Sequence, residues 1–190
     1  DLVARLTDLE RLAVLPEPGE RCAQWSSFDR QSRYDPDTDT YRQWEANGDG
    51  NGIIGREGEL QVLAEMEGPG CIWRIWSARA GKGHVRIYLD GAETPAVDMP
   101  FADYFNGQRA PFNRPGLVHT VAQGLNCYVP IPYQKSCKIV AEPGWGQYYH
   151  FTYSTFPPGT TVPTFRMDMA EADAAALDRA DQIIRNCGQD

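Results

Sequence analysis

The chain has 190 residues, a length that fits one domain with extensions and allows a core to form without disulfide bridges. Hydrophobic residues make up 42% of the chain and charged residues 23%, which is typical of a globular domain. The formal charge of −8 argues against binding to nucleic acid or an anionic membrane, because both need clustered Lys and Arg.

The first predicted element is a helical lead-in, which we delimit at residues 1–19. Thr7 and Glu10 have the spacing of a capping box, which predicts the start of a short helix. One face of this helix would be apolar and formed by Leu6, Leu9 and Ala13. Two prolines beyond residue 15 end the element.

Residues 26–56 are predicted to form a long irregular loop. The run Asn47–Gly52 (NGDGNG) is dense in turn residues, and a loop of this length inside a domain is a candidate for function. Asp35, Asp37 and Asp39 alternate as they do at the start of a calcium loop. Thr40 stands where an EF-hand needs Gly, so we expect a solvated acidic loop and no metal site.

Short strands follow, separated by Gly and Pro turns at the spacing of an all-β sandwich. The predicted strands are Leu60–Met66, Cys71–Arg79, His84–Leu89, Thr94–Met99, Asn126–Val129, Ser136–Ala141 and Gln147–Thr155. They place an antiparallel sandwich over residues 20–165.

The tail, residues 166–190, predicts a helix near 169–187. Asp168 and Glu171 have the spacing of an N-cap and its third-position carboxylate, and Gly188 suits the position after the helix. Because this helix ends the chain, we interpret it as a linker toward a second domain that is missing here.

Five cysteines are widely spaced and form no CxxC pair, which indicates buried or free thiols and argues against a disulfide framework and a zinc site. No nucleophile elbow or phosphate loop occurs, so no cofactor is predicted. Asp1–Arg5 lacks the features of a signal peptide and no apolar run of about 18 residues is present, which leaves the compartment open between cytoplasm and periplasm.

Aromatic and acidic residues point to sugar chemistry. Sugars have apolar ring faces and hydroxyl rims, so a sugar site combines flat aromatic rings with carboxylates, amides or Arg. Trp44 lies in the loop beside Glu45 and Asn47, whereas Trp73 and Tyr88 are expected in the core. Paired carboxylates carry glycoside hydrolysis, but the sequence alone cannot pair its candidates. These are Asp29, Glu45, Asp49, Asp98 and Asp103.

Five ordered blocks resemble a known family. They are QWSSFDR (Gln24–Arg30), EGPGCIWRIW (Glu67–Trp76), IYLDG (Ile87–Gly91), FADYF (Phe101–Phe105) and LNCYVPIPYQKSC (Leu125–Cys137). The lead-in LTDLERLA (Leu6–Ala13) resembles it too. The chain is identified as a member of the domain of unknown function 2961 family, grouped as glycoside hydrolase family 172, and matches its N-terminal half.

This resemblance implies a jelly roll, the first of two in tandem. It implies retaining, exo-acting hydrolysis of fructofuranosides or arabinofuranosides, with a carbohydrate as the partner, and assembly into homotrimers or larger symmetric oligomers. A nucleophilic Glu and an acid/base Glu are expected in the second jelly roll. FADYF has Ala102 where the related block of the second jelly roll has a catalytic Glu.

We therefore assign no catalytic residue and expect these 190 residues to be inactive alone. The expected substrate-binding residues are Asp29, Arg30, Trp44, Asn47, Asp49 and Trp76. Two alternatives stay open at this point: a stand-alone carbohydrate-binding jelly roll, and a jelly roll that supports oligomer assembly without catalysis.

Overall fold

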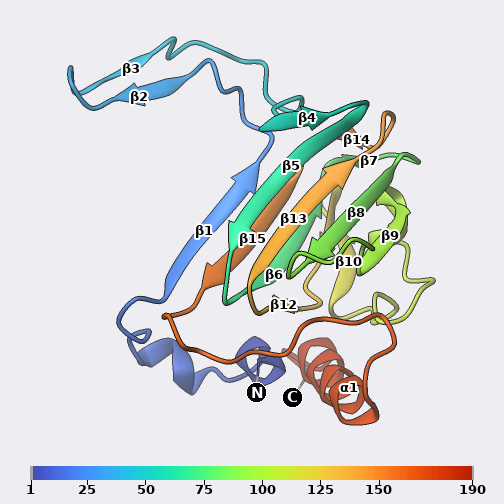
Figure 1. The fold of residues 1–190 in the computed structure, drawn as a ribbon. Coiled ribbons are helices and arrows are strands. Elements are labelled where there is room, and N and C mark those ends of the chain that lie inside the picture. Colours follow the sequence, from blue (N-terminus) through green and yellow to red (C-terminus); the bar gives the residue numbers. More distant parts are fainter. Residues whose placement is uncertain (1, 190) are drawn as a thin grey trace.

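The computed structural model describes residues 2–189, which form two antiparallel sheets that face each other (Figure 1). The first sheet has the order β1 (Arg21–Ser26), β15 (His150–Thr155), β6 (Gly70–Ser77), β11 (Gly124–Cys127) and β10 (Val118–Val121), and β12 (Ile131–Tyr133) also pairs with β6. The second sheet has the order β4 (Gly55–Glu57), β5 (Leu60–Glu67), β13 (Ser136–Ala141), β8 (His84–Leu89) and β9 (Val97–Pro100).

Eight of these strands follow the jelly-roll order. In chain order they are β1, β5, β6, β8, β9, β11, β13 and β15. The first sheet contains the first, eighth, third and sixth of them, and the second sheet contains the second, seventh, fourth and fifth. This is the double Greek key of a jelly roll, so the predicted all-β fold is confirmed.

Alternating side chains fill the space between the sheets. In β8, Val85, Ile87 and Leu89 are buried while the residues between them are partly exposed, as the two-residue period of a strand requires. Hydrogen bonds offset the cost of burying two tyrosine hydroxyl groups. Tyr149 Oη donates to the Leu63 carbonyl and Tyr104 Oη donates to the Val85 carbonyl, both at 2.9 Å. Tyr104 ends the short 3-10 helix η3 (Phe101–Tyr104), which follows β9.

The N-terminal lead-in forms two single 3-10 turns, η1 (Val3–Leu6) and η2 (Glu10–Ala13), rather than one helix. The predicted capping box is wrong, because Asp8 Oδ1, and not Thr7, accepts the backbone N–H of Arg11 at 3.2 Å. The predicted apolar face is wrong as well: Leu9 is 76% exposed, since two separate turns do not present one continuous face to the core.

A hairpin projects from the end of β1, away from the two sheets (Figure 1). It consists of β2 (Arg33–Asp35) and β3 (Thr40–Arg42), within the segment predicted as an irregular loop. The prediction missed it because cross-strand contacts stabilise it: the rings of Tyr34 and Tyr41 meet edge to face at 5.4 Å, and Arg42 pairs with Asp35.

The tail forms the helix α1 (Glu171–Arg185), as predicted, with Leu177 and Ala180 buried. Its N-cap residue is Ala170 rather than Asp168, whose carboxylate is paired with Arg166 at 2.7 Å. Two short strands, β7 (Arg79–Ala80) and β14 (Gly146–Gln147), pair beside the hairpin end of the sandwich. Among the described residues, no helix combines the length and apolar character needed to cross a membrane.

Candidate functional site

Two of the predicted site residues, Asp29 and Asp49, meet where β1 ends. Asp29 Oδ2 accepts the backbone N–H of Gly48 at 2.8 Å, and Asp49 Oδ1 accepts the backbone N–H of Asp29 at 2.6 Å. The two aspartates therefore join the outgoing and returning chains at the base of the projecting hairpin. We call residues 27–30 and 48–50 the loop cluster, and the exposed Asn47 lies beside it, one residue before Gly48.

Buried Ser27 fixes the loop cluster to the sandwich. Its carbonyl accepts the backbone N–H of Gly50 at 2.8 Å, and its hydroxyl accepts the backbone N–H of Tyr149 at 3.1 Å. Gly50 has a φ of 104°, and a Cβ there would lie 2.8 Å from the Tyr148 ring, so this position requires glycine. The glycine-rich run is thus explained by close backbone packing.

Arg30 is the cation of the loop cluster. Its Nη2 donates to the Ser26 carbonyl at 2.9 Å, and its guanidinium lies 4.6 Å from the centre of the Phe28 ring. Phe28 is exposed, so Arg30 and Phe28 together form a cation–aromatic surface at the rim of the loop cluster.

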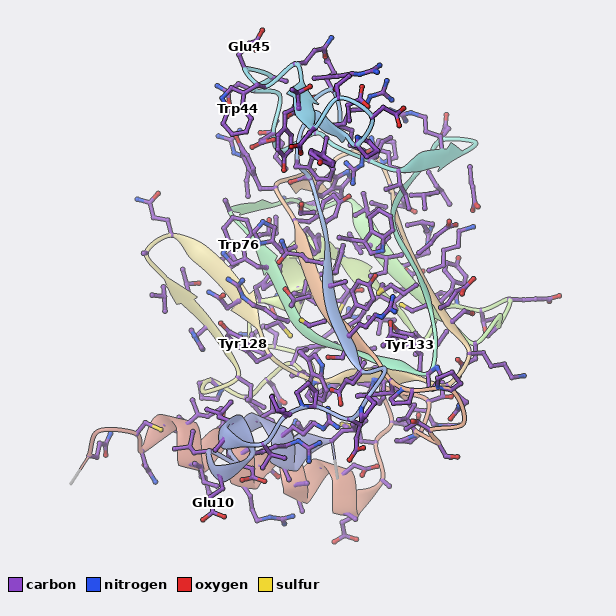
Figure 2. All side chains as sticks on the ribbon, turned by 90° about the vertical axis from the view of Figure 1, so that its left-hand side faces the viewer. Glu10, Trp44, Glu45, Trp76, Tyr128 and Tyr133 are labelled. Atoms are coloured by element: carbon purple, nitrogen blue, oxygen red, sulfur yellow. The ribbon has the colours of Figure 1, made fainter. Side chains whose placement is uncertain are left out.

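Trp44 lies apart from Trp76. It is 73% exposed on the projecting hairpin and loop, and its ring meets Tyr41 edge to face at 5.4 Å. Figure 2 shows Trp44 and Glu45 at one extremity of the molecule and Trp76 at the level of the sheets. The six predicted residues therefore do not form a single pocket within this chain.

Trp76 lies on the outer face of the first sheet, because its neighbour Ile75 points into the core. Its ring lies 4.6 Å from the ring of His150, and the Arg74 guanidinium is 5.9 Å from its centre. Sequence reasoning missed His150 and Arg74 as neighbours. Alternation along β6 places Arg74 and Trp76 on one face, but only the strand pairing brings His150 to them.

Four carboxyl groups have environments that disfavour a role as general acid. In the described residues, four carboxyl groups have a pKa clearly away from the usual value, and in each it is lowered: Asp35, Asp90, Asp98 and Asp168. Asp98 illustrates the cause. Burial opposes the charged form, but hydrogen bonds from His84 Nδ1 at 2.6 Å and Arg86 Nε at 3.0 Å lower its pKa. A general acid needs the opposite shift.

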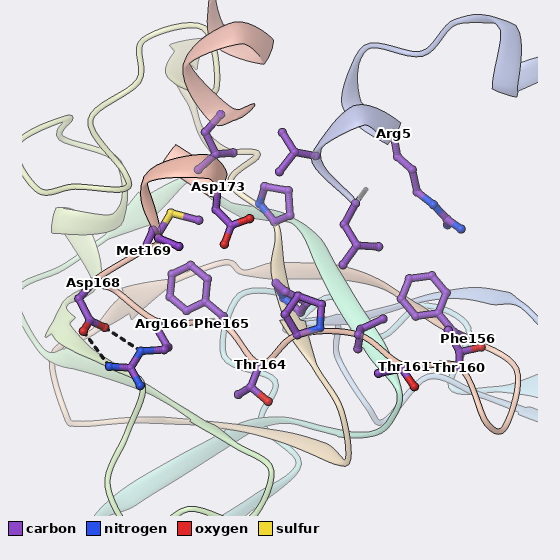
Figure 3. A pocket seen from close by; sticks show the side chains of 18 of the residues that line it. Arg5, Phe156, Thr160, Thr161, Thr164, Phe165, Arg166, Asp168, Met169 and Asp173 are labelled. Atoms are coloured by element: carbon purple, nitrogen blue, oxygen red, sulfur yellow. Dashed lines mark hydrogen bonds and ion pairs between the residues drawn. The ribbon is translucent and has the colours of Figure 1, made fainter. Parts of the chain in front are cut away.

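A pocket of about 870 Å³ lies at the opposite end of the sandwich (Figure 3). It is lined by the N-terminal segment, residues 156–170 and α1, including Phe156, Phe165 and Leu177. None of the six predicted site residues lines it. Within residues 2–189, no group of three or more His, Cys, Asp or Glu side chains could hold a metal ion.

The fold and the surface chemistry define an all-β jelly-roll domain with aromatic and amide-bearing surfaces, whose perturbed carboxyl groups stay ionised. Comparison with known families gives the same class. The model of the GH172 first beta-sandwich domain matches residues 18–173, and the chain belongs to this family. It is therefore related to glycoside hydrolases, as its sequence blocks predict. A search of curated proteins gave no match.

Proposed function

We propose that this chain is the first, non-catalytic β-sandwich of a retaining, exo-acting glycoside hydrolase that cleaves fructofuranosides or arabinofuranosides. The observation that carries the proposal is the match to the first GH172 sandwich over most of the chain. Because that domain is described as the first, we place the catalytic glutamates in a second sandwich.

The state of the carboxyl groups supports this division of labour. Retaining hydrolysis needs two carboxyl groups about 5–5.5 Å apart, one ionised and one protonated. Protonation at neutral pH requires a raised pKa, and the four clearly shifted carboxyl groups of the described residues all move downward. These four groups are therefore unsuited to proton donation, and we expect the chain to contribute binding and support.

The loop cluster is the proposed sugar-contacting part. Asp29, Arg30 and Asp49 already share hydrogen bonds with backbone groups, so their positions are fixed before a ligand arrives. Exposed Asn47 and Trp44 extend this surface toward the projecting hairpin. We also propose assembly into a trimer or a multiple of it. The family resemblance and the exposed apolar side chains of Leu12, Val14 and Leu15 support this assembly.

The test compares the 190-residue chain with a longer protein that carries both sandwiches, on aryl arabinofuranosides and aryl fructofuranosides. We expect no turnover by the chain alone and turnover with retention of configuration by the longer protein, followed by NMR of the released sugar. Turnover by the chain alone that is lost in Asp29→Asn or Asp103→Asn would place the catalytic centre in this half and overturn the proposal.

A second measurement addresses the loop cluster. In the longer protein, Asp29→Asn should raise KM with a smaller change in kcat, because the loop cluster binds sugar without joining the reaction. Glu93→Gln, an exposed change in the turn between β8 and β9, serves as the matched control and should leave both constants unchanged. If the longer protein binds furanosides but never cleaves them, a stand-alone carbohydrate-binding or scaffolding role replaces hydrolysis.

A further inference from the structure

The first sheet has an unusual charge distribution. The chain contains 26 Asp and Glu residues and has a formal charge of −8, yet none of the six strands of the first sheet contains an acid. These strands carry Arg21, Arg74, His119 and His150. In the second sheet, by contrast, Arg86 is paired with Asp98 and Glu142, and Lys138 with Glu57.

Arg74 is the cation at the centre of the first sheet's outer face. No carboxylate in residues 2–189 lies within ion-pair distance of it; instead Nε and Nη2 both donate to the neutral Asn126 Oδ1, at 3.2 and 2.9 Å. Asn126 Nδ2 in turn donates to the Gly124 carbonyl at 2.9 Å, which fixes the orientation of the amide. The guanidinium is thus held in place while its charge stays uncompensated.

Two aromatic rings lie next to this charge, and each of them packs against a histidine ring. The guanidinium lies 5.9 Å from the ring centres of both Trp76 and Tyr128, and Figure 2 shows these two residues on the same side of the sandwich. Tyr128 is stacked on His119 at 5.8 Å, and Trp76 lies against His150 at 4.6 Å. We call this set of six residues the Arg74 surface: Arg74, Trp76, His119, Asn126, Tyr128 and His150.

Close packing across strands builds the Arg74 surface. A Cβ at Gly124 would lie 2.6 Å from Trp76 Nε1, so the glycine allows the indole to lie over β11. The positive charge of Arg74 also reaches His150, whose pKa is lowered by burial and by that charge. Both histidines and both larger rings are partly exposed, so a ligand has access to them.

We propose that the Arg74 surface binds a saccharide that carries a carboxylate, such as a uronic acid residue. The carboxylate pairs with the guanidinium, and the sugar ring packs on Trp76 or Tyr128. A neutral sugar would not pair with the charge of Arg74, and a small inorganic anion would not pack on the aromatic rings. The proposal rests on the proposed carbohydrate function of the chain, which makes a saccharide the favoured source of the carboxylate.

The test measures binding of trigalacturonate to the 190-residue chain by calorimetry and by tryptophan fluorescence, with neutral galactotriose as the comparison. We expect trigalacturonate to bind at least ten-fold more tightly, and binding to weaken when NaCl is raised. Arg74→Gln and Trp76→Leu should each weaken binding at least ten-fold. Arg86→Gln, which removes a partly buried arginine from the outer face of the second sheet, is the matched control and should leave it unchanged.

Three results would overturn the proposal: no binding of trigalacturonate, equal binding of galactotriose, or equal and Arg74-dependent binding of tri-glutamate, which would identify an acidic peptide site. Thermal unfolding of each variant separates loss of the site from loss of the fold. The experiment uses no furanoside and measures no turnover. Absence of trigalacturonate binding would therefore not contradict the proposed hydrolysis, and absence of hydrolysis would not contradict the binding result.

Discussion

Asp90 links three segments that are distant in sequence. It occupies the turn after β8 with a φ of 57°, and its carboxylate accepts hydrogen bonds from the backbone N–H groups of Lys135 at 2.5 Å and Ser136 at 3.2 Å and from the Thr164 hydroxyl. Burial opposes the charged form, but these hydrogen bonds outweigh it and lower the pKa of Asp90 below its usual value of 3.8.

Asp90→Asn should therefore lower the free energy of unfolding by about 1–2 kcal/mol at pH 7, because an amide accepts these hydrogen bonds less well than a carboxylate. Asn tolerates the left-handed backbone, so strain does not confound the result. A lowered pKa stabilises the fold above pH 3.8, and this stabilisation is lost as the pH falls through the folded-state pKa. The difference between variant and parent in urea unfolding should shrink below about pH 4.

Asp168→Asn is the matched control for this measurement. Asp168 also has a lowered pKa, caused by hydrogen bonding and charge pairing with Arg166, but both side chains are exposed and water screens the pair. The Asp168→Asn substitution should leave the free energy of unfolding at pH 7 nearly unchanged. Equal effects of the two substitutions would contradict a specific role for Asp90.

Sequence reasoning at the residue scale singled out Trp76 and residues of the loop cluster as candidates, but it did not connect Trp76 with the other residues of the Arg74 surface. Asp29, Arg30 and Asp49 lie in the segment 26–56, whose predicted irregular structure made it a candidate for function. Asn126, Tyr128 and His150 take their places through the pairing of β11 and β15 with β6. No local pattern encodes that pairing, because it joins residues about 50 to 80 positions apart.

At the scale of elements, hydrogen bonds hold α1 against the segment of residues 111–118. Arg114 Nε donates to Asp178 Oδ1 at 2.9 Å, and its Nη2 donates to the Ala174 carbonyl at 3.2 Å. Buried Asp181 accepts the backbone N–H of Gly116 at 2.6 Å. A Cβ at Gly116 would lie 2.7 Å from the Asp181 carbonyl, so glycine allows this close approach.

Asp181→Ala should lower the free energy of unfolding by about 2 kcal/mol, because it leaves the buried N–H of Gly116 without an acceptor. Hydrogen exchange should also accelerate selectively in α1, since the helix loses a link to the sandwich. Asp178→Ala removes a mostly exposed partner of Arg114 and should have a much smaller effect. Unchanged exchange in α1 of the Asp181 variant would show that apolar packing alone holds the helix.

Strands were predicted best where burial alternates. His84–Leu89 and Ser136–Ala141 have the predicted bounds, because polar and apolar residues alternate along β8 and the inward positions of β13 are apolar. β1 was missed because its sequence, RCAQWS, shows no such alternation and its first four residues are exposed. Its pairing with β15, over six residues, makes it a strand. The local pattern of residues therefore predicts the inner strands, whereas an edge strand such as β1 forms because it pairs with a neighbouring strand.

At the scale of the whole molecule, the five cysteines divide into two classes. All are free thiols: Cys71, Cys127 and Cys137 are buried, whereas Cys22 and Cys187 are exposed. Burial raises the pKa of Cys127 to about 12 and raises that of the other two buried thiols as well. The wide spacing in the sequence predicted free or buried thiols, and this prediction is confirmed.

Titration with Ellman's reagent at pH 8 should therefore modify two thiols rapidly in the native protein and all five after unfolding. The three buried thiols should react at the rate of global or local opening, so stabilising the fold slows them. Cys22→Ser combined with Cys187→Ser should abolish the rapid phase. Rapid modification of a third thiol would contradict the close packing of the sandwich.

In the jelly-roll order, the last strand, β15, is the sheet partner of both β1 and β6 in the first sheet. β15 lies between β1 and β6, and in the second sheet the late strand β13 lies between β5 and β8. A growing chain that ends before residue 150 therefore leaves β1 without its sheet partner and one edge of β6 open. Unpaired edges of this kind associate with other chains. During synthesis the first sheet is therefore completed only after β15 has emerged from the ribosome, and until then its open strand edges can pair with those of other nascent chains.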